Sequence, residues 1–326
     1  MDRLLPVGIS RDKSHPIFNF FMNYYHFQPS MLRFFSPGLG VMVGTESDDD
    51  YKYDLPKKGR VIYNDSCVIY DPKLAKFCEK QVNSFKKTLR ILEATQRRPP
   101  NLHCYGLHEW AMLYSRSVPF ITQSLPLRDR LSNEVIREVV ETQGPTCTHY
   151  DAFRFFSQDA VILNSTSTSL SSKSKSAYEV SLTRDNEEDY EQPGCLHSIM
   201  DIFKWSVKIF PFLSSNLVVD ALELALRARE VDMRASPYNL KAYKYLVNRS
   251  EGMKYDQNNE QYVHLCEDFD VNNNNNLGSN FNSAPIMIET VEGRREYAKL
   301  QRNLYMQAKP IRDKLIMSYK MLLDAL

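Results

Sequence analysis

Four short blocks of the chain place histidine, carboxylate and basic side chains among aromatic ones. Ionisable groups in such apolar surroundings must be paired, neutralised or chemically active, because an unpaired buried charge costs several kcal/mol. Imidazole and carboxylate groups are also common proton carriers and metal ligands in enzymes. The blocks therefore predict a site for acid–base or metal-assisted chemistry, and they occupy residues 107–110, 149–154, 195–204 and 232–238.

The third block carries three polar residues at the spacing of one helix face. His197, Asp201 and Lys204 lie at positions i, i+4 and i+7, so a helix brings them close enough to act together on a ligand or a metal ion. The apolar residues around them, from Leu196 to Trp205, favour an interior position. A polar helix face with an ordinary ion pair is the alternative.

The second block contains His149, Asp151 and Arg154, whose partners depend on the local conformation. His149 and Asp151 share a face in an extended chain, whereas Asp151 and Arg154 share one in a helix. A carboxylate between an imidazole and a guanidinium is suited to act as a general base or an electrostatic stabiliser. It is equally suited to a structural ion pair.

The first and fourth blocks belong to a helix and to a helix end. His108 and Glu109 are neighbours on an apolar helix and point about 100° apart, so we expect at most one of them to face a given site. Asp232, Arg234 and Tyr238 follow the end of a predicted helix, where a turn can aim side chains at a ligand.

These spacings give two sets of candidate residues. The predicted catalytic residues are Glu109, His149, Asp151, Arg154, His197 and Asp201. The predicted substrate-binding residues are His108, Trp110, Tyr150, Lys204, Asp232, Arg234 and Tyr238. The sequence lacks dinucleotide, phosphate-loop, nucleophile-elbow and His-Glu-x-x-His motifs. No motif therefore requires a cofactor, and a divalent metal is the cofactor left open.

Hydrophobic periodicity, capping residues and turn residues predict a mainly α-helical chain. The predicted helices cover residues 15–27, 71–97, 102–114, 134–142, 196–212, 217–233 and 289–326, the last with a bend near Pro310. A short strand is expected at 41–43, and a hairpin is expected to join 61–63 to 67–70.

Residues 1–326 are predicted to form one mainly helical domain with two low-complexity insertions. The first, at 164–189, is rich in Ser, Thr and Lys and ends in an acidic run. The second, at 244–283, is rich in Asn. Both compositions contain too few apolar residues to form a core of their own.

The composition is that of a globular protein, with 43% hydrophobic and 12% aromatic residues. The 41 Lys and Arg residues balance 40 Asp and Glu residues, and the net charge of +1 gives no electrostatic reason to expect DNA as an obligatory partner. A signal peptide and a membrane span of ~20 apolar residues are both absent from the sequence. We expect a cytoplasmic or nuclear protein with no membrane partner, whose six single cysteines are reduced thiols.

Several blocks together closely resemble a bacterial and plant family labelled 3-methyladenine DNA glycosylase. The resemblance spans nearly the whole chain outside the two insertions. The second insertion falls where members of that family run directly from one shared block into the next. The blocks that carry it are residues 15–16, 24–25, 36–38, 106–112, 126–128, 149–156, 191–197, 232–238 and 288–290.

The resemblance implies hydrolysis of an N-glycosidic bond in DNA or in a free nucleoside or nucleotide. A carboxylate such as Asp151 or Glu109 would then stabilise the cation-like sugar and activate water. One of Trp110, Tyr150 and Tyr238 would stack on the extruded base. The expected partner is thus a small-molecule or nucleobase-containing substrate, with DNA as one form of it.

Two further hypotheses fit the same residues. In the first, the protein is a metal-dependent enzyme, with ligands drawn from the two histidines and three carboxylates at Glu109, His149, Asp151, His197 and Asp201. In the second, it is a non-enzymatic binding or scaffold protein, and the polar blocks are buried salt bridges that fix the register of the helices.

Overall fold

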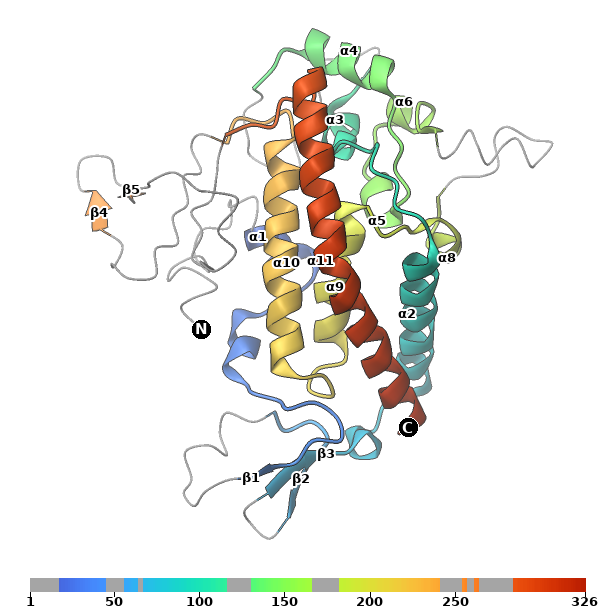
Figure 1. Cartoon of the computed structure of the whole chain (residues 1–326), viewed down its shortest axis with the longest axis vertical. Coiled ribbons are helices and arrows are strands. Elements are labelled where there is room, and N and C mark those ends of the chain that lie inside the picture. The colour runs from blue at the N-terminus through green and yellow to red at the C-terminus, as the bar shows by residue number, and fades with distance from the viewer. Residues whose placement is uncertain are drawn as a thin grey trace, which may run out of the picture.

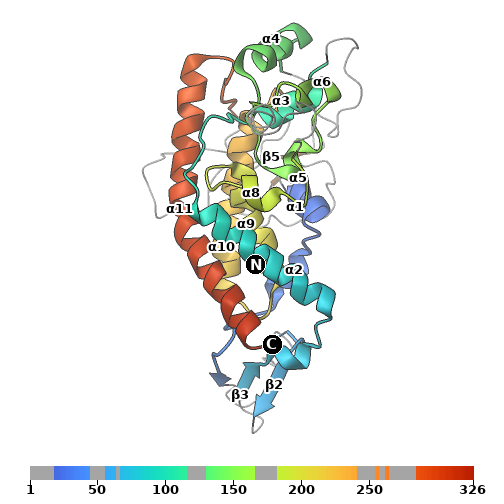
Figure 2. The same cartoon turned by 90° about the vertical axis from the view of Figure 1, so that its right-hand side faces the viewer.

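A computed structural model describes residues 18–44, 56–63, 67–115, 130–165, 182–240, 254–256, 261–263 and 284–326. Its body is a group of long helices: α2 (Glu79–Arg97), α9 (Leu196–Lys208), α10 (Ser215–Arg234) and α11 (Val291–Asp324). Helix α10 packs against α9 and α11, and α11 also packs against α9 and α2 (Figure 1). Figure 2 shows α11 extending along most of the length of the molecule. The predicted mainly α-helical fold is confirmed.

Residues close to the ends of helices α9, α10 and α11 determine where these helices begin or end. Helix α10 starts after Ser214, whose side chain accepts a hydrogen bond from the amide of Leu217. Helix α9 ends at Lys208, short of the predicted 212, because Pro211 cannot continue a helix. Helix α11 starts after Thr290, which caps the amide of Gly293. The predicted positions of these helices are therefore confirmed to within a few residues.

Two predicted helix starts are wrong. The helix expected at 102–114 begins only with α3 (Leu107–Leu113), because Tyr105 and Gly106 have φ values of 47° and 70°, which lie outside helical geometry. The helix expected from residue 71 is a 3₁₀ turn, Pro72–Ala75, followed by Lys76 at φ 50°. Helix α2 starts three residues later, at Glu79.

The remaining helices are short and surround the long ones. They are α1 (Phe18–Tyr24), a 3₁₀ turn (Pro29–Arg33), α4 (Asn133–Gln143), α5 (Tyr150–Phe153), α6 (Gln158–Val161) and α8 (Glu187–Tyr190). Helices α3, α4 and α6 lie at the end of the body opposite the sheet (Figure 1).

The predicted hairpin is confirmed. Strands β2 (Arg60–Tyr63) and β3 (Cys67–Tyr70) pair antiparallel, with Ile62 opposite Val68. Strand β1 (Val43–Gly44) pairs with the other edge of β3, close to the strand expected at 41–43. Gly59, at φ 70°, precedes β2, and a Cβ there would lie 2.8 Å from the ring of Phe212. Strands β4 (Lys254–Asp256) and β5 (Gln261–Val263) form a second antiparallel pair.

The first predicted insertion is narrower than residues 164–189. Asn164 is fully buried, and its side chain bonds the backbone of Cys147 in both directions, at 2.8 and 3.1 Å. At the other end, Leu182 and Glu187 are buried against the body. Both ends are therefore part of the fold. Residues 166–181, and all of 244–283 except β4 and β5, lie outside the described residues.

Lys208, at the end of α9, gives a prediction about the pH dependence of stability. Its ammonium donates to Thr88 Oγ1 at 2.7 Å, and burial lowers its pKa to about 8 from 10.5. From about pH 8 to 10.5 the unfolded chain holds this proton more tightly than the folded protein, so the lysine's contribution to stability rises with pH. We expect the stability of wild type relative to Lys208→Met to increase between about pH 7 and pH 10.

Urea unfolding of both proteins at the two pH values measures this change. Lys86→Met, at an exposed position of α2, serves as the matched control. A difference between wild type and Lys208→Met that is the same at both pH values would contradict the prediction.

Candidate active site

Two buried carboxylates and an arginine form the first part of the site. Arg229, on α10, donates to Glu109 Oε1 at 3.1 Å and to Asp232 Oδ2 at 2.5 Å. All three residues are less than 5% exposed. The pairing keeps both carboxylates ionised: burial opposes this, but the neighbouring His108 and Arg229 lower the pKa of Asp232 and of Glu109.

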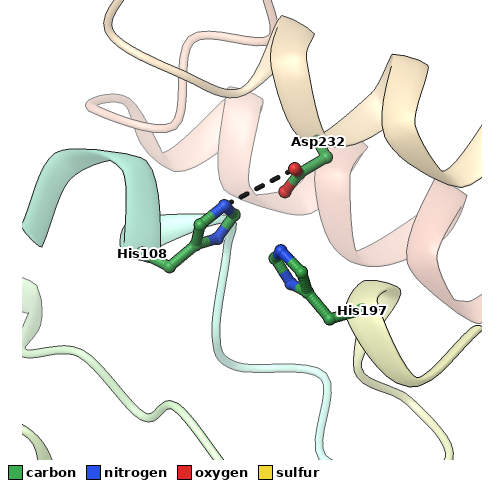
Figure 3. A group of neighbouring side chains, drawn as sticks. All are labelled: His108, His197 and Asp232. Atoms are coloured by element: carbon green, nitrogen blue, oxygen red, sulfur yellow. Dashed lines mark ion pairs between the residues drawn. The ribbon is translucent and has the colours of Figure 1, made fainter. Parts of the chain in front are cut away.

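His108 lies beside these carboxylates, on the first turn of α3. Its Nε2 is 3.5 Å from Asp232 Oδ2 (Figure 3), and it is also 3.5 Å from Glu109 Oε1. Burial disfavours the charged ring, but the two carboxylates outweigh it and raise the pKa of His108 to about 9. Of these two neighbours, His108 lines the cavity described below and Glu109 does not, as expected for side chains that point about 100° apart. Arg229 contacts both carboxylates and so joins Glu109 to the group around His108.

His197, on the first turn of α9, completes the group. Figure 3 shows it facing His108 and Asp232. Its ring meets that of His108 edge to face, with centroids 4.3 Å apart, and stacks on His149 at 5.3 Å. Burial and the neighbouring His108 lower the pKa of His197 well below its usual value. His197 is therefore a neutral imidazole between two histidines that favour their charged forms.

His149 belongs to a second buried pair. Its Nδ1 is 2.5 Å from Oε2 of Glu191, and both side chains are almost fully buried. Burial disfavours its charged form, but Glu191 raises the pKa of His149 to about 9. Glu191 was not among the predicted site residues. Its only signal in the sequence is its place in the block at 191–197 that resembles the glycosylase-labelled family.

The remaining predicted polar residues form a third group around Lys204. Its ammonium lies 3.1 Å from Asp151 Oδ2 and 2.9 Å from Asp201 Oδ2. Asp201 Oδ1 also accepts from the Tyr25 hydroxyl at 2.7 Å. Arg154 lies 3.3 Å from Asp151, the partner expected for a helical segment. His197, Asp201 and Lys204 thus share helix α9, but His197 belongs to the group around His108, whereas Asp201 and Lys204 pair with each other.

Four other predicted substrate-binding residues lie away from this centre. Trp110 is fully buried, and its indole donates to the carbonyl of Ala235 at 2.9 Å. Tyr238 is 2% exposed and packs in the core. Tyr150 is partly exposed beside Arg184, and Arg234 bonds the carbonyl of Ala284. Trp110 and Tyr238 are therefore part of the core, which leaves neither ring free to stack on a base.

A cavity of about 20 Å³ lies against His108, His197 and Asp232, large enough for about one water-sized group. Within the described residues, four buried polar atoms here lack a hydrogen-bond partner: His108 Nε2, Asp232 Oδ1, Thr146 Oγ1 and Thr148 Oγ1. Unsatisfied buried polar atoms are uncommon in native proteins and indicate a function or a bound group. The rest of the lining comes from Cys104, Leu107, Pro145, Cys147, Gln192, Cys195, Leu196 and Tyr297.

The cysteines of this lining are not activated nucleophiles. Burial raises the pKa of Cys104, Cys147 and Cys195, and the thiolate is the reactive form. All three are free thiols, as expected from the sequence. The reactive groups at the cavity are therefore His108, His197 and Asp232.

Fold and site together define a mainly α-helical protein with a buried histidine–carboxylate centre. Comparisons of the chain with protein-family models, with curated proteins and with solved structures found no match. None of the helices in the described residues combines the length and apolar character needed to cross a membrane.

Proposed function

We propose that the protein is a hydrolase whose reaction takes place at the cavity beside His108, His197 and Asp232. The observation that supports this proposal most directly is the pair of buried carboxylates, Glu109 and Asp232, which share Arg229. Among the described residues, Glu109 Oε2 and Asp232 Oδ1 each lack a hydrogen-bond partner. Oriented, ionised carboxylates beside a neutral imidazole are groups that activate water.

The bond cleaved is N-glycosidic, in DNA or in a free nucleoside or nucleotide, with 3-methyladenine as the expected base. The resemblance of residues 106–112, 149–156 and 191–197 to the glycosylase-labelled family supports this bond class. Glycosidic cleavage passes through a cation-like sugar, and carboxylates close to the sugar stabilise it. The ionised Asp232 is suited to that role.

Asp232, the carboxylate that lines the cavity, also activates the water in this reaction. Its Oδ1 accepts a proton from water, the water oxygen bonds to the anomeric carbon, and the bond from that carbon to the base nitrogen breaks. The base leaves with the electron pair and takes up the proton from Asp232. The cavity admits the water but not a nucleobase, so sugar and base lie outside it, where His197, Thr146 and Thr148 are partly exposed.

We expect Asp232→Asn to lower the rate of base release by roughly 10²–10⁴-fold, the usual effect of losing a general base. The assay measures, by chromatography, bases released from methylated DNA and from methylated nucleosides and nucleotides. Asp220→Asn, at an exposed position of α10, is the matched control and should retain the wild-type rate. Circular dichroism checks that each variant is folded.

Two results would reject this function. One is folded wild-type protein that releases no base from any of these substrates. The other is a folded Asp232→Asn variant that releases base at the wild-type rate. A variant whose only defect is reduced stability would favour the binding or scaffold hypothesis.

A further inference from the structure

Three groups of side chains in the described part of the chain are close enough to hold a metal ion. In each group, one ligand atom per residue lies within 4.8 Å of the others. The groups are His149–Asp151–Asp201, His149–Glu191–Cys195 and His108–His197–Asp232. Proximity alone does not make a metal site. The other contacts of each ligand atom therefore decide which of the three groups can bind an ion.

The group formed by His149, Asp151 and Asp201 already contains a cation. The Lys204 ammonium lies between the two carboxylates, at 3.1 and 2.9 Å. Asp151 Oδ1 is also 3.1 Å from Arg184, and Asp201 Oδ1 accepts from a tyrosine hydroxyl. A metal ion here would have to displace Lys204, so this group is a salt-bridge cluster.

The group formed by His149, Glu191 and Cys195 is also satisfied. His149 Nδ1 and Glu191 Oε2 are already partners of each other, at 2.5 Å. Cys195 is buried as a thiol, and metals bind the thiolate. This group lacks a free ligand atom of the right protonation state.

The group formed by His108, His197 and Asp232 differs because its ligand atoms border the cavity. His108 Nε2 and Asp232 Oδ1 lack hydrogen-bond partners among the described residues, although both are buried. The ring of His197 lines the same cavity, and its centroid lies 4.3 Å from that of His108. Two further oxygens without such partners, from Thr146 and Thr148, line the same space and can bond water on an ion.

We propose that this cavity binds one divalent transition-metal ion through His108, His197 and Asp232. Two imidazoles and one carboxylate suit zinc, iron or manganese, whereas magnesium and calcium prefer oxygen ligands. Arg229 holds Asp232 by Oδ2 and leaves Oδ1 for the ion.

The role of the ion rests on the proposed function, whereas its binding does not. An ion at these three residues would hold a water molecule on the side that the protein ligands leave open and lower its pKa, so that hydroxide forms near neutral pH. The ion would then replace Asp232 as the group that activates water. The site would thus use the arrangement of two histidines and one carboxylate found in many catalytic metal centres.

Titration of the full chain with zinc chloride tests the proposal. The protein is first stripped with EDTA, and zinc uptake is followed by calorimetry, with magnesium chloride as the comparison. We expect one zinc ion per chain and much weaker magnesium binding. His197→Gln and Asp232→Asn should each weaken zinc binding at least ~100-fold, because even outer partners of metal ligands contribute roughly 10–100-fold.

Matched controls separate this site from adventitious binding. His103→Gln and Asp220→Asn change exposed residues of the same types and should retain wild-type affinity. Because ligand variants can fail to fold, histidine ring resonances of the wild-type protein are also followed during zinc addition. Those of His108 and His197 should move together, and that of His103 should not.

Three results would overturn the metal site. One is stripped wild type that takes up no zinc, and another is uptake unchanged in folded His197→Gln and Asp232→Asn. The third is zinc binding that is lost in Asp151→Asn and retained in His197→Gln, which would place the ion at the Lys204 group. Base release by zinc-free protein would reject the catalytic role of the ion alone, whereas zinc binding without base release would reject the hydrolase alone.

Discussion

Arg229→Met is expected to lower the free energy of unfolding by about 3–5 kcal/mol, the usual effect of breaking a buried ion pair. Arg229 is 3% exposed and is within hydrogen-bond distance of both Glu109 and Asp232. Methionine fills similar space but leaves two buried carboxylates with His108 as their remaining cation. Urea unfolding of wild type and variant near neutral pH measures the loss.

Two further variants test the cause of this loss. Arg227→Met removes an exposed arginine from the same helix and should change stability by no more than about 0.5 kcal/mol. Adding Glu109→Gln and Asp232→Asn to Arg229→Met removes the uncompensated charges, so it should recover part of the stability. If the triple variant is as unstable as the sum of its single changes, lost packing and not unpaired charge is the cause.

Glu191→Gln is expected to destabilise the protein in a pH-dependent way, by on the order of 3 kcal/mol below about pH 6.5. Glu191 raises the pKa of the buried His149 to about 9 from 6.5. The pair's contribution is therefore complete below the unfolded pKa of 6.5 and disappears as pH rises through about 9. Without Glu191, His149 must lose its proton to remain buried.

Unfolding of metal-free protein at several pH values between about 6 and 9 measures this effect. Glu188→Gln is the matched control, because Glu188 forms a more exposed ion pair with Arg90 at 3.1 Å and should cost no more than about 1 kcal/mol. A loss in Glu191→Gln that stays constant from the lowest to the highest pH would show that lost packing, and not the charge on His149, is responsible.

Much of the helical framework was predictable because its signals are local. The apolar spacing of residues 217–233 and the cap at Ser214 predicted α10 almost to its ends. The hairpin followed from the β-branched and aromatic residues on either side of a turn. The two wrong helix starts lie at positions where the backbone angle of one or two residues decides where the helix begins. Tyr105, Gly106 and Lys76 have positive φ values that apolar periodicity does not reveal.

The site was predictable only as a set of residue types. His108, Glu109, His197 and Asp232 were all among the predicted residues, but none of their mutual contacts was foreseen. His108 and Asp232 are 124 positions apart in the sequence and meet because α3 packs near the end of α10. Arg229 was missed, although its i, i+3 spacing to Asp232 is visible in the sequence.

The sequence by itself determined which helices form, which residues can carry protons, and that these residues lie in apolar surroundings. Those properties depend on neighbours within a few positions along the chain. Only the tertiary structure decided that Lys204 also pairs with Asp151, that Glu191 pairs with His149, and that Asp232 faces His108 across the cavity. The physical reason is that ion pairs and cavities depend on distances of a few ångströms between segments far apart in the sequence, and helix packing alone sets those distances.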